Sequence, residues 1–190
     1  RFRTPGLGGR VWEKLGATVT NMAAGEIFQA LQSGTLDAAE FVGPYNDLAL
    51  GFHQVAKNYY MPSFVESGLA TELVVDKKKY QELPEDLQAI IRDVSQAEYD
   101  QVAADFYAND PRALKTLVEE HGVTVRNFPD DIMEAGAKAS VEVVEELRSS
   151  DDPLVKKTAD SLVEALNLVR TRTEKIDSPY IQARQSFLKY

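Results

Sequence analysis

Residues 1–9, which read RFRTPGLGG, place the end of a predicted strand directly before a glycine-rich turn. Apolar and polar side chains alternate over the first residues, as they do along a half-buried strand. The pattern then predicts, in order, a short amphipathic segment at 11–15, a strand at 17–22, a helix at 26–32 ended by Gly34, and an extended segment at 36–42. The order strand, helix, strand, helix, strand predicts an α/β fold.

Beyond residue 50 the chain continues with strands and then becomes mainly helical. Pro84-Glu85-Asp86 has the proline and the acidic residues that are typical of a helix start. Asn109-Asp110-Pro111 and Ser178-Pro179 are expected to end helices, because proline interrupts helical hydrogen bonding. These signals predict strands at 55–61, 71–75 and 123–128, and helices at 84–108, 112–121, 129–148 and from 151 onward.

The last predicted helix carries apolar residues at alternating steps of four and three positions. Such a seam is typical of a helix that packs along another helix. The neighbour is either the chain's own core or a second chain, and the spacing leaves both open. The seam residues are Val155, Ala159, Leu162, Leu166, Val169, Thr173 and Ile176.

The chain has 190 residues, a formal net charge of −9 and no cysteine. The acidic balance argues against nucleic acid as a partner, because a duplex binder needs a basic surface to neutralise phosphates. The lack of cysteine excludes disulfides, thiolate metal sites and cysteine nucleophiles. Because the sequence starts at Arg1, inside a predicted strand, we expect it to be a C-terminal piece of a longer protein.

Three charged residues stand at the ends of predicted strands, where α/β folds place ligand contacts. The Arg3 guanidinium either grips a carboxylate through two parallel hydrogen bonds or pairs with a surface acid. Glu40 lies in a small and apolar segment, so its carboxylate needs a cation, an arginine or backbone amides as a partner. Glu40 and Glu66 are an acid/base pair, a hard-cation site or unrelated surface groups, and spacing alone does not choose.

Four blocks of sequence, in order and suitably separated, resemble the solute-binding proteins of tripartite ATP-independent periplasmic (TRAP) transporters. The resemblance is specific up to about residue 80, and the helical remainder matches in layout. The third block resembles the branch that binds 2-oxo acids and other small monocarboxylates. The blocks are FRTPGLGG at 2–9, GEIFQALQSGTLDA at 25–38, EFVGPYND at 40–47, and GF with AKNYY within 51–60.

The resemblance implies two α/β lobes of the type II periplasmic binding-protein kind, closing on a ligand by hinge motion, with a long C-terminal helix. In these terms residues 1–42 belong to one lobe and residues 43–83 cross between the lobes. Residues 84–150 pack on the lobes, and residues 151–190 form the long helix and tail with an expected dimer contact.

The resemblance also implies roles for individual residues. Arg3 would clamp the substrate carboxylate, with Glu40 and Phe41 beside it in the binding site. A sodium or calcium ion next to the substrate would be held by Glu40, the backbone oxygen of Phe41, and Glu66. Phe41 replaces the family's more usual tryptophan, and Val65 and Ser67 replace its usual histidine and proline, so we expect a ligand other than the commonest one.

The sequence therefore favours a periplasmic binding protein that captures a small carboxylate and delivers it to a TRAP membrane permease without performing chemistry. A homodimer through the C-terminal helix is part of this hypothesis. One alternative is a hydrolase or lyase that acts on small acids with Glu40 and Glu66 as an acid/base pair. Another is a sensory ligand-binding module that is detached from any transporter.

Overall fold

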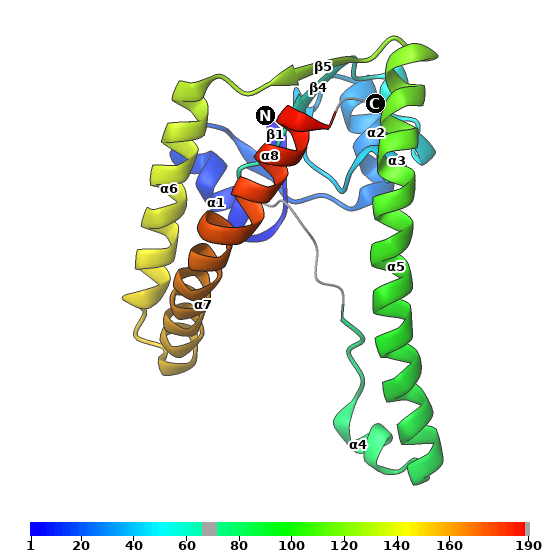
Figure 1. The fold of residues 1–190 in the computed structure, drawn as a ribbon, viewed down its shortest axis with the longest axis vertical. Helices are drawn as coiled ribbons and strands as arrows, with labels where there is room; N and C mark the ends of the chain where they lie inside the picture. Colours follow the sequence, from blue (N-terminus) through cyan, green and yellow to red (C-terminus); the bar gives the residue numbers. More distant parts are fainter. Residues whose placement is uncertain (66–71, 189–190) are drawn as a thin grey trace. The chain divides into compact units, whose positions relative to one another are not determined.

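The computed structural model describes residues 1–65 and 72–188 (Figure 1). The chain divides into two compact units, Arg1–Ala137 and Lys138–Tyr190. The elements of the first unit are β1 (Phe2–Arg3), α1 (Gly6–Lys14), β2 (Val19–Thr20), α2 (Ala24–Gln32), β3 (Ala38–Ala39), α3 (Pro44–Ala49), the 3-10 helix η1 (Phe52–Gln54), β4 (Asn58–Met61), α4 (Lys77–Gln81), α5 (Glu85–Glu119) and β5 (Thr124–Asn127). Helix α6 (Asp130–Arg148) leads into the second unit, which continues with α7 (Pro153–Arg172), the π-helical turn η2 (Thr173–Asp177) and α8 (Ser178–Phe187).

The first unit contains a parallel sheet in which β1 lies between β2 and β3. Arg3 pairs with Thr20 on one side and with Ala39 on the other, so the carboxyl ends of all three strands meet at one edge. Helices α1 and α2 connect the strands, as the predicted order requires. Gly34 follows α2 with φ +73°, which confirms its predicted role at the helix end.

The glycine-rich segment differs from the prediction, because Gly6–Gly9 form the first turn of α1 instead of a loop. Glycine is needed there for close packing. A Cβ on Gly9 would lie 3.1 Å from Val19 Cγ1, and one on Gly8 would lie 3.3 Å from Thr4 Oγ1. The missing side chains therefore allow α1 to approach the end of β1 closely.

A second parallel pair joins β4 to β5, with Asn58 opposite Thr124 and Met61 opposite Asn127. These strands match the predicted ones at 55–61 and 123–128. The predicted strand at 71–75 is wrong over residues 72–75, which have no regular secondary structure, and residue 71 lies outside the described residues. An apolar, β-branched run forms a strand only when a neighbouring strand pairs with it, and residues 72–75 have no such partner among the described residues.

Helix α5 is a single helix, seen as the long green ribbon of Figure 1, and the predicted break at residues 109–111 is wrong. Pro111 lies inside it. Packing against α3 opposes the local cost of this proline. Asp110 accepts a hydrogen bond of 3.0 Å from the Tyr45 backbone N–H at the start of α3, and the Tyr45 ring meets Phe106 edge-on at 6.2 Å.

An aromatic cluster connects the first sheet with the second strand pair. Trp12 of α1 lies 4.6 Å from the Phe2 ring and 4.9 Å from the Phe64 ring, measured between centroids. Phe128 lies 5.4 Å from Phe64. A Cβ on Gly136 of α6 would collide with the Phe64 ring, so this ring rests directly on the helix backbone. The chain just after β4 is thus held from two sides.

In the second unit, α7 begins at Pro153 after Asp152, whose carboxylate accepts a hydrogen bond of 2.8 Å from the Leu154 backbone N–H. Helix formation continues through η2 into α8, so the predicted end at Ser178-Pro179 is wrong. The π-helical turn explains the difference. It shifts the hydrogen-bond register just before Pro179, whose missing N–H would otherwise interrupt the helix.

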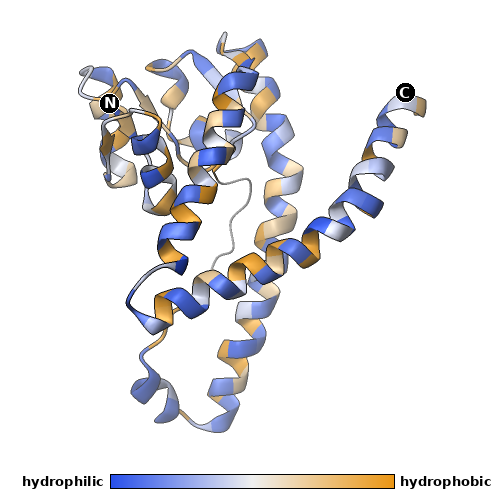
Figure 2. Ribbon diagram, turned by 90° about the vertical axis from the view of Figure 1, so that its left-hand side faces the viewer, coloured by the Kyte–Doolittle hydropathy of each residue, from blue (hydrophilic) through white to orange (hydrophobic). Residues whose placement is uncertain are grey.

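The apolar residues of α7 and α8 are interspersed with polar ones, as Figure 2 shows by colour. Within the seam, Ala159 is 4% exposed, whereas Leu162, Leu166 and Val169 are 43%, 55% and 58% exposed. The first part of the seam is therefore buried within the protein and the later part is not. No helix among the described residues has the length and apolar character needed to cross a membrane.

Candidate functional site

Arg3 stands at the carboxyl end of the central strand β1 and is only 7% exposed. Its Nε donates a hydrogen bond of 3.0 Å to the Met22 carbonyl oxygen, and one terminal nitrogen donates a bond of 2.7 Å to the Glu40 carbonyl oxygen. Both acceptors are neutral. In these two hydrogen bonds the guanidinium is held by backbone carbonyl oxygens that follow the two neighbouring strands, and not by a carboxylate.

Glu40 directly follows β3 and is bound to β1 through both its backbone and its side chain. The Glu40 backbone N–H donates a hydrogen bond of 2.8 Å to the Arg3 carbonyl oxygen. The Thr4 hydroxyl donates a bond of 3.2 Å to Glu40 Oε2. Together with the Arg3 side chain, these contacts hold Glu40 at the sheet edge, half-buried beside the guanidinium.

Phe41 completes this edge as a half-buried aromatic residue. The Arg3 guanidinium carbon lies 5.7 Å from the centroid of the Phe41 ring, within the range of a cation–π interaction. On its other side the ring meets Phe52 edge-on at 5.8 Å. The structure thus brings together three of the four predicted site residues, Arg3, Glu40 and Phe41.

The fourth predicted residue, Glu66, lies outside the described residues. The residue before it, Val65, is placed, and it lies near the start of α1. A Cβ added to Gly8 would be 3.5 Å from Val65 Cγ2 and 3.3 Å from Thr4 Oγ1. Over residues 1–65 and 72–188, no group of three or more histidine, aspartate or glutamate side chains is arranged to hold a metal ion.

A buried acid network behind this edge was not predicted from the sequence. Asp47 of α3 is 9% exposed, and its Oδ2 accepts a hydrogen bond of 2.6 Å from the Tyr59 hydroxyl. The Val42 backbone N–H is near enough to lower the pKa of Asp47, but the buried Oδ1 has no hydrogen-bond partner among the described residues. Burial raises the pKa of Asp47 to about 6 despite these donors, and nearby Asp110 raises it further. Burial and the Asp47 charge raise the pKa of Tyr59 as well.

This network joins α3 to β4, because Asp47 comes from α3 and Tyr59 from β4. The available signal in the sequence was the position of Asp47 in the first turn of a helix opened by Pro44, where a carboxylate can accept backbone N–H groups. Tyr59 carried no comparable signal, since it comes from a separate strand.

Two histidines that are far apart in the sequence stack on each other. The rings of His53 and His121 lie 4.0 Å apart, nearly parallel, and Lys57 Nζ donates a hydrogen bond of 2.9 Å to the His121 carbonyl oxygen. Burial, followed by the neighbouring His121 and Lys57, lowers the pKa of His53. The pair joins η1 to the segment where α5 leads into β5.

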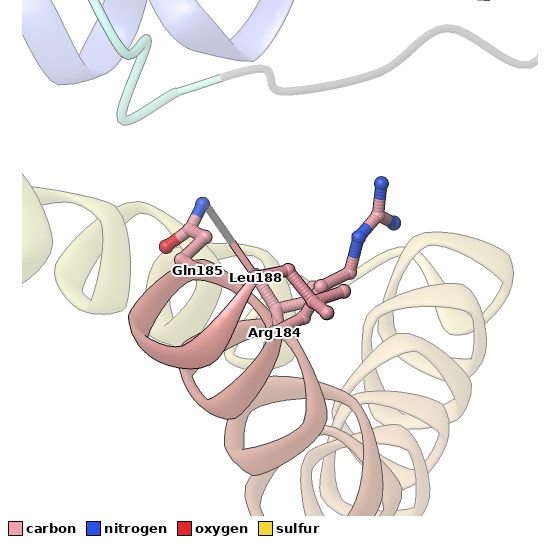
Figure 3. Close-up of a pocket in the computed structure, with 4 residues that line it drawn as sticks. Arg184, Gln185 and Leu188 are labelled. Carbon is pink, nitrogen blue, oxygen red and sulfur yellow. The ribbon is translucent and has the colours of Figure 1, made fainter. Parts of the chain in front are cut away.

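Figure 3 shows a hollow at α8, lined by Ile181, Arg184, Gln185 and Leu188. All four residues come from one helix and its end. The Arg184 and Gln185 side chains extend to different sides of the helix in this view. The hollow therefore lacks the converging polar groups of a ligand site.

Comparisons with known proteins show which family the chain resembles. Residues 1–151 match the family described as bacterial extracellular solute-binding protein, family 7. The chain is 34% identical over 151 residues to a monocarboxylate 2-oxoacid-binding periplasmic protein of Nostoc sp. strain PCC 7120, which covers 80% of this chain and 41% of that protein.

Two solved structures of TRAP periplasmic solute-binding proteins are similar over almost the whole chain. The one from Colwellia psychrerythraea, with bound calcium and pyruvate, has a TM-score of 0.80 and 34% identity and covers 96% of this chain and 55% of that one. The one from Pseudoalteromonas atlantica T6c, with bound sodium and pyruvate, has a TM-score of 0.80 and 32% identity and covers 95% and 55%. These matches confirm the predicted resemblance and α/β fold, and the chain spans about half the length of these relatives.

Replacing Asp47 by asparagine should flatten the pH dependence of stability. Because the native-state pKa of about 6 exceeds the ordinary 3.8, the folded protein holds a proton that the unfolded chain releases between these values. The free energy of unfolding therefore falls as pH rises from 4 to 6, by about 2 kcal/mol from this group. In Asp47→Asn this component is absent.

Urea denaturation at pH 4, 5, 6 and 7 gives the free energy of unfolding of the variant and the wild type, and the slope of this free energy against pH is compared between them. Asp93→Asn is the matched control, because Asp93 is an exposed acid with 77% of its side-chain surface accessible, and its replacement should leave the slope unchanged. An Asp47→Asn protein with the same slope as wild type would contradict the buried, protonated carboxyl.

Proposed function

Because the chain belongs to the bacterial extracellular solute-binding protein family 7, we propose that it forms the ligand-gripping portion of a periplasmic solute-binding protein for a small carboxylate. The protein would deliver this ligand to a TRAP membrane permease. The observation that carries the proposal is the buried Arg3 guanidinium at the carboxyl edge of the sheet, held by two neutral carbonyl oxygens. A 2-oxo acid or similar monocarboxylate is the ligand class that the relatives support.

The charge of Arg3 supports an anionic ligand. A buried cation needs an opposite charge or strong acceptors, and carbonyl oxygens satisfy hydrogen bonds without cancelling charge. The two bonds from Arg3 fix the plane of the guanidinium. A planar guanidinium matches the two oxygens of a carboxylate better than a lysine ammonium does. The Phe41 ring beside it supplies an apolar wall for the rest of a small ligand.

A hard cation beside the ligand is the second part of the proposal. Carboxylate and backbone carbonyl oxygens are the ligands that calcium prefers, and Glu40 with the Phe41 backbone oxygen offers this chemistry next to Arg3. Glu66 is the further proposed ligand. The ion would supply positive charge for the ligand's oxygens, in keeping with the calcium or sodium found with pyruvate in the two related structures.

The family assignment favours binding over catalysis. The family and the relatives at 30% identity or more are solute-binding proteins, so the hydrolase or lyase with Glu40 and Glu66 as an acid/base pair is set aside. The roles proposed for Arg3 and Glu40 need no proton transfer. They require only that the carboxylate of Glu40 stays charged and in place while the ligand binds.

A homodimer through the C-terminal helix is the proposed assembly. Leu162, Leu166, Val169 and Ile176 keep the heptad-like spacing and remain 43% to 58% exposed. A second copy of the same helix has the same spacing and can cover these side chains by interdigitation. The buried Ala159 indicates that the chain's own core accounts only for the first part of the seam.

Replacing Arg3 by lysine should lower pyruvate affinity about 100-fold in the full-length protein, because the charge remains but the planar, bidentate donor is lost. Isothermal titration calorimetry in the presence of calcium measures this change. Arg126→Lys is the control, since Arg126 is an exposed arginine of β5 that bonds to Asn58. Unchanged affinity in Arg3→Lys would overturn the carboxylate clamp.

Replacing Glu40 by glutamine should weaken pyruvate binding at least tenfold at limiting calcium, because the neutral amide is a poorer ligand for a hard cation. The same titrations with and without a chelator should show that wild-type affinity depends on the cation, whereas the affinity of Glu40→Gln depends on it much less. Glu13→Gln, at an exposed position of α1, should behave as wild type. Insensitivity of the wild type to chelator and to sodium removal would count against the cation.

Replacing Leu166 by glutamate should convert a dimer into a monomer, because a charge would be buried in the helix seam without a partner. Size-exclusion chromatography with light scattering reads out the mass. Leu168→Glu is the matched control, because Leu168 is 70% exposed and lies off the seam. A wild-type protein that stays monomeric at every protein concentration loaded on the column would refute the proposed dimer.

A further inference from the structure

Thr4 is among the most deeply buried polar residues of the described chain, at 2% exposure. It directly follows β1 and lies next to Arg3 in the sequence. Its hydroxyl is 3.2 Å from Glu40 Oε2. In this contact the hydroxyl is the donor, because an ionised carboxylate only accepts hydrogen bonds. A hydroxyl in this position therefore acts on the side chain of the proposed cation ligand.

The place of this hydroxyl is defined by the start of α1. A Cβ on Gly8 would lie 3.3 Å from Thr4 Oγ1, and a Cβ on Gly9 would lie 4.0 Å from Thr4 Cγ2. The glycines thus let the helix close over Thr4 while leaving the hydroxyl room to reach Glu40. Val65, the residue before Glu66, borders the same Gly8 position.

The backbone of Glu40 is already fixed by two bonds with Arg3, one at its N–H and one at its carbonyl oxygen. These bonds do not fix the side-chain torsions, which decide where the carboxylate oxygens point. The Thr4 hydroxyl bonds one of these oxygens and restricts its orientation. Groups that orient a ligand in this way commonly change metal affinity 10- to 100-fold when they are removed.

We propose that Thr4 is a positioning residue for the cation: its buried hydroxyl orients the Glu40 carboxylate, and cation affinity depends on it. The proposal rests on the cation-assisted carboxylate binding proposed above. Thr4 acts through Glu40 and not on the carboxylate ligand, whose clamp is Arg3. Loss of the hydroxyl therefore weakens calcium binding first, and pyruvate binding only as far as pyruvate depends on calcium.

Thr4→Val in the full-length protein removes the hydroxyl and keeps the branched shape. Calorimetric titration with calcium at a fixed pyruvate concentration should give a 10- to 100-fold weaker apparent calcium affinity. At saturating calcium, pyruvate affinity should return to within about threefold of wild type, since a saturated cation site restores the same bound state. Thr4→Ser should keep wild-type calcium affinity, and Thr124→Val, at an exposed threonine of β5, should have no effect.

A purely structural role for Thr4 predicts something different, namely a loss of pyruvate affinity that persists at saturating calcium and a lower melting temperature without ligand. Either that pattern, or wild-type calcium affinity in Thr4→Val, overturns the proposal. Should Thr4→Val fail to fold, Thr4→Ala is measured against Thr4→Ser by the same titrations. If the wild type itself does not bind pyruvate in the presence of calcium, the proposed function is wrong, and the role of Thr4 is wrong with it. This outcome is distinct from a loss of affinity in Thr4→Val alone.

Discussion

The hydrogen bond from Arg3 to the Glu40 carbonyl oxygen is the contact on which the site depends. It joins the end of the central strand β1 to the residue after β3 and forces the guanidinium to lie along the sheet edge. The return bond from the Glu40 N–H to the Arg3 carbonyl oxygen closes the pair. The Arg3 guanidinium and the Glu40 backbone are thereby held at fixed positions beside each other at the end of the sheet.

The surrounding structure supports this arrangement from two sides. Helix α1 packs on Thr4 because Gly8 and Gly9 have no side chains to keep it away. On the far side, the buried carboxyl of Asp47 in α3 accepts a hydrogen bond from the Tyr59 hydroxyl of β4. Ionising a buried carboxyl group costs free energy, and this cost raises the pKa of Asp47 to about 6. Side chains that are already held by hydrogen bonds favour ligand affinity, because fewer groups have to be ordered on binding.

Local signals predicted the order of elements in the first sheet and the positions of Arg3 and Glu40 at strand ends, because strand ends and glycine positions are encoded over a few residues. Features that need a partner element were not predictable. Pro111 is a local signal for a helix end, whereas α5 continues through it and packs against α3. The Asp47–Tyr59 bond and the His53–His121 stack join separate elements, and a single sequence does not show such pairs. The role of Glu66 stays a prediction, since it lies outside the described residues.

A net charge of −9 does not prevent this edge from holding an anion. At physiological salt, exposed charges are screened over about 8 Å, so distant acids contribute little at the site. Arg3 is largely removed from water. In this less polar environment its charge interacts several times more strongly with a nearby charge than it would in water. A cation on Glu40 would add a second positive charge next to it. Since Arg3 and Glu40 share a hydrogen bond, each bound species would stabilise the residue that holds the other, and by linkage the cation and the carboxylate would strengthen each other's binding equally.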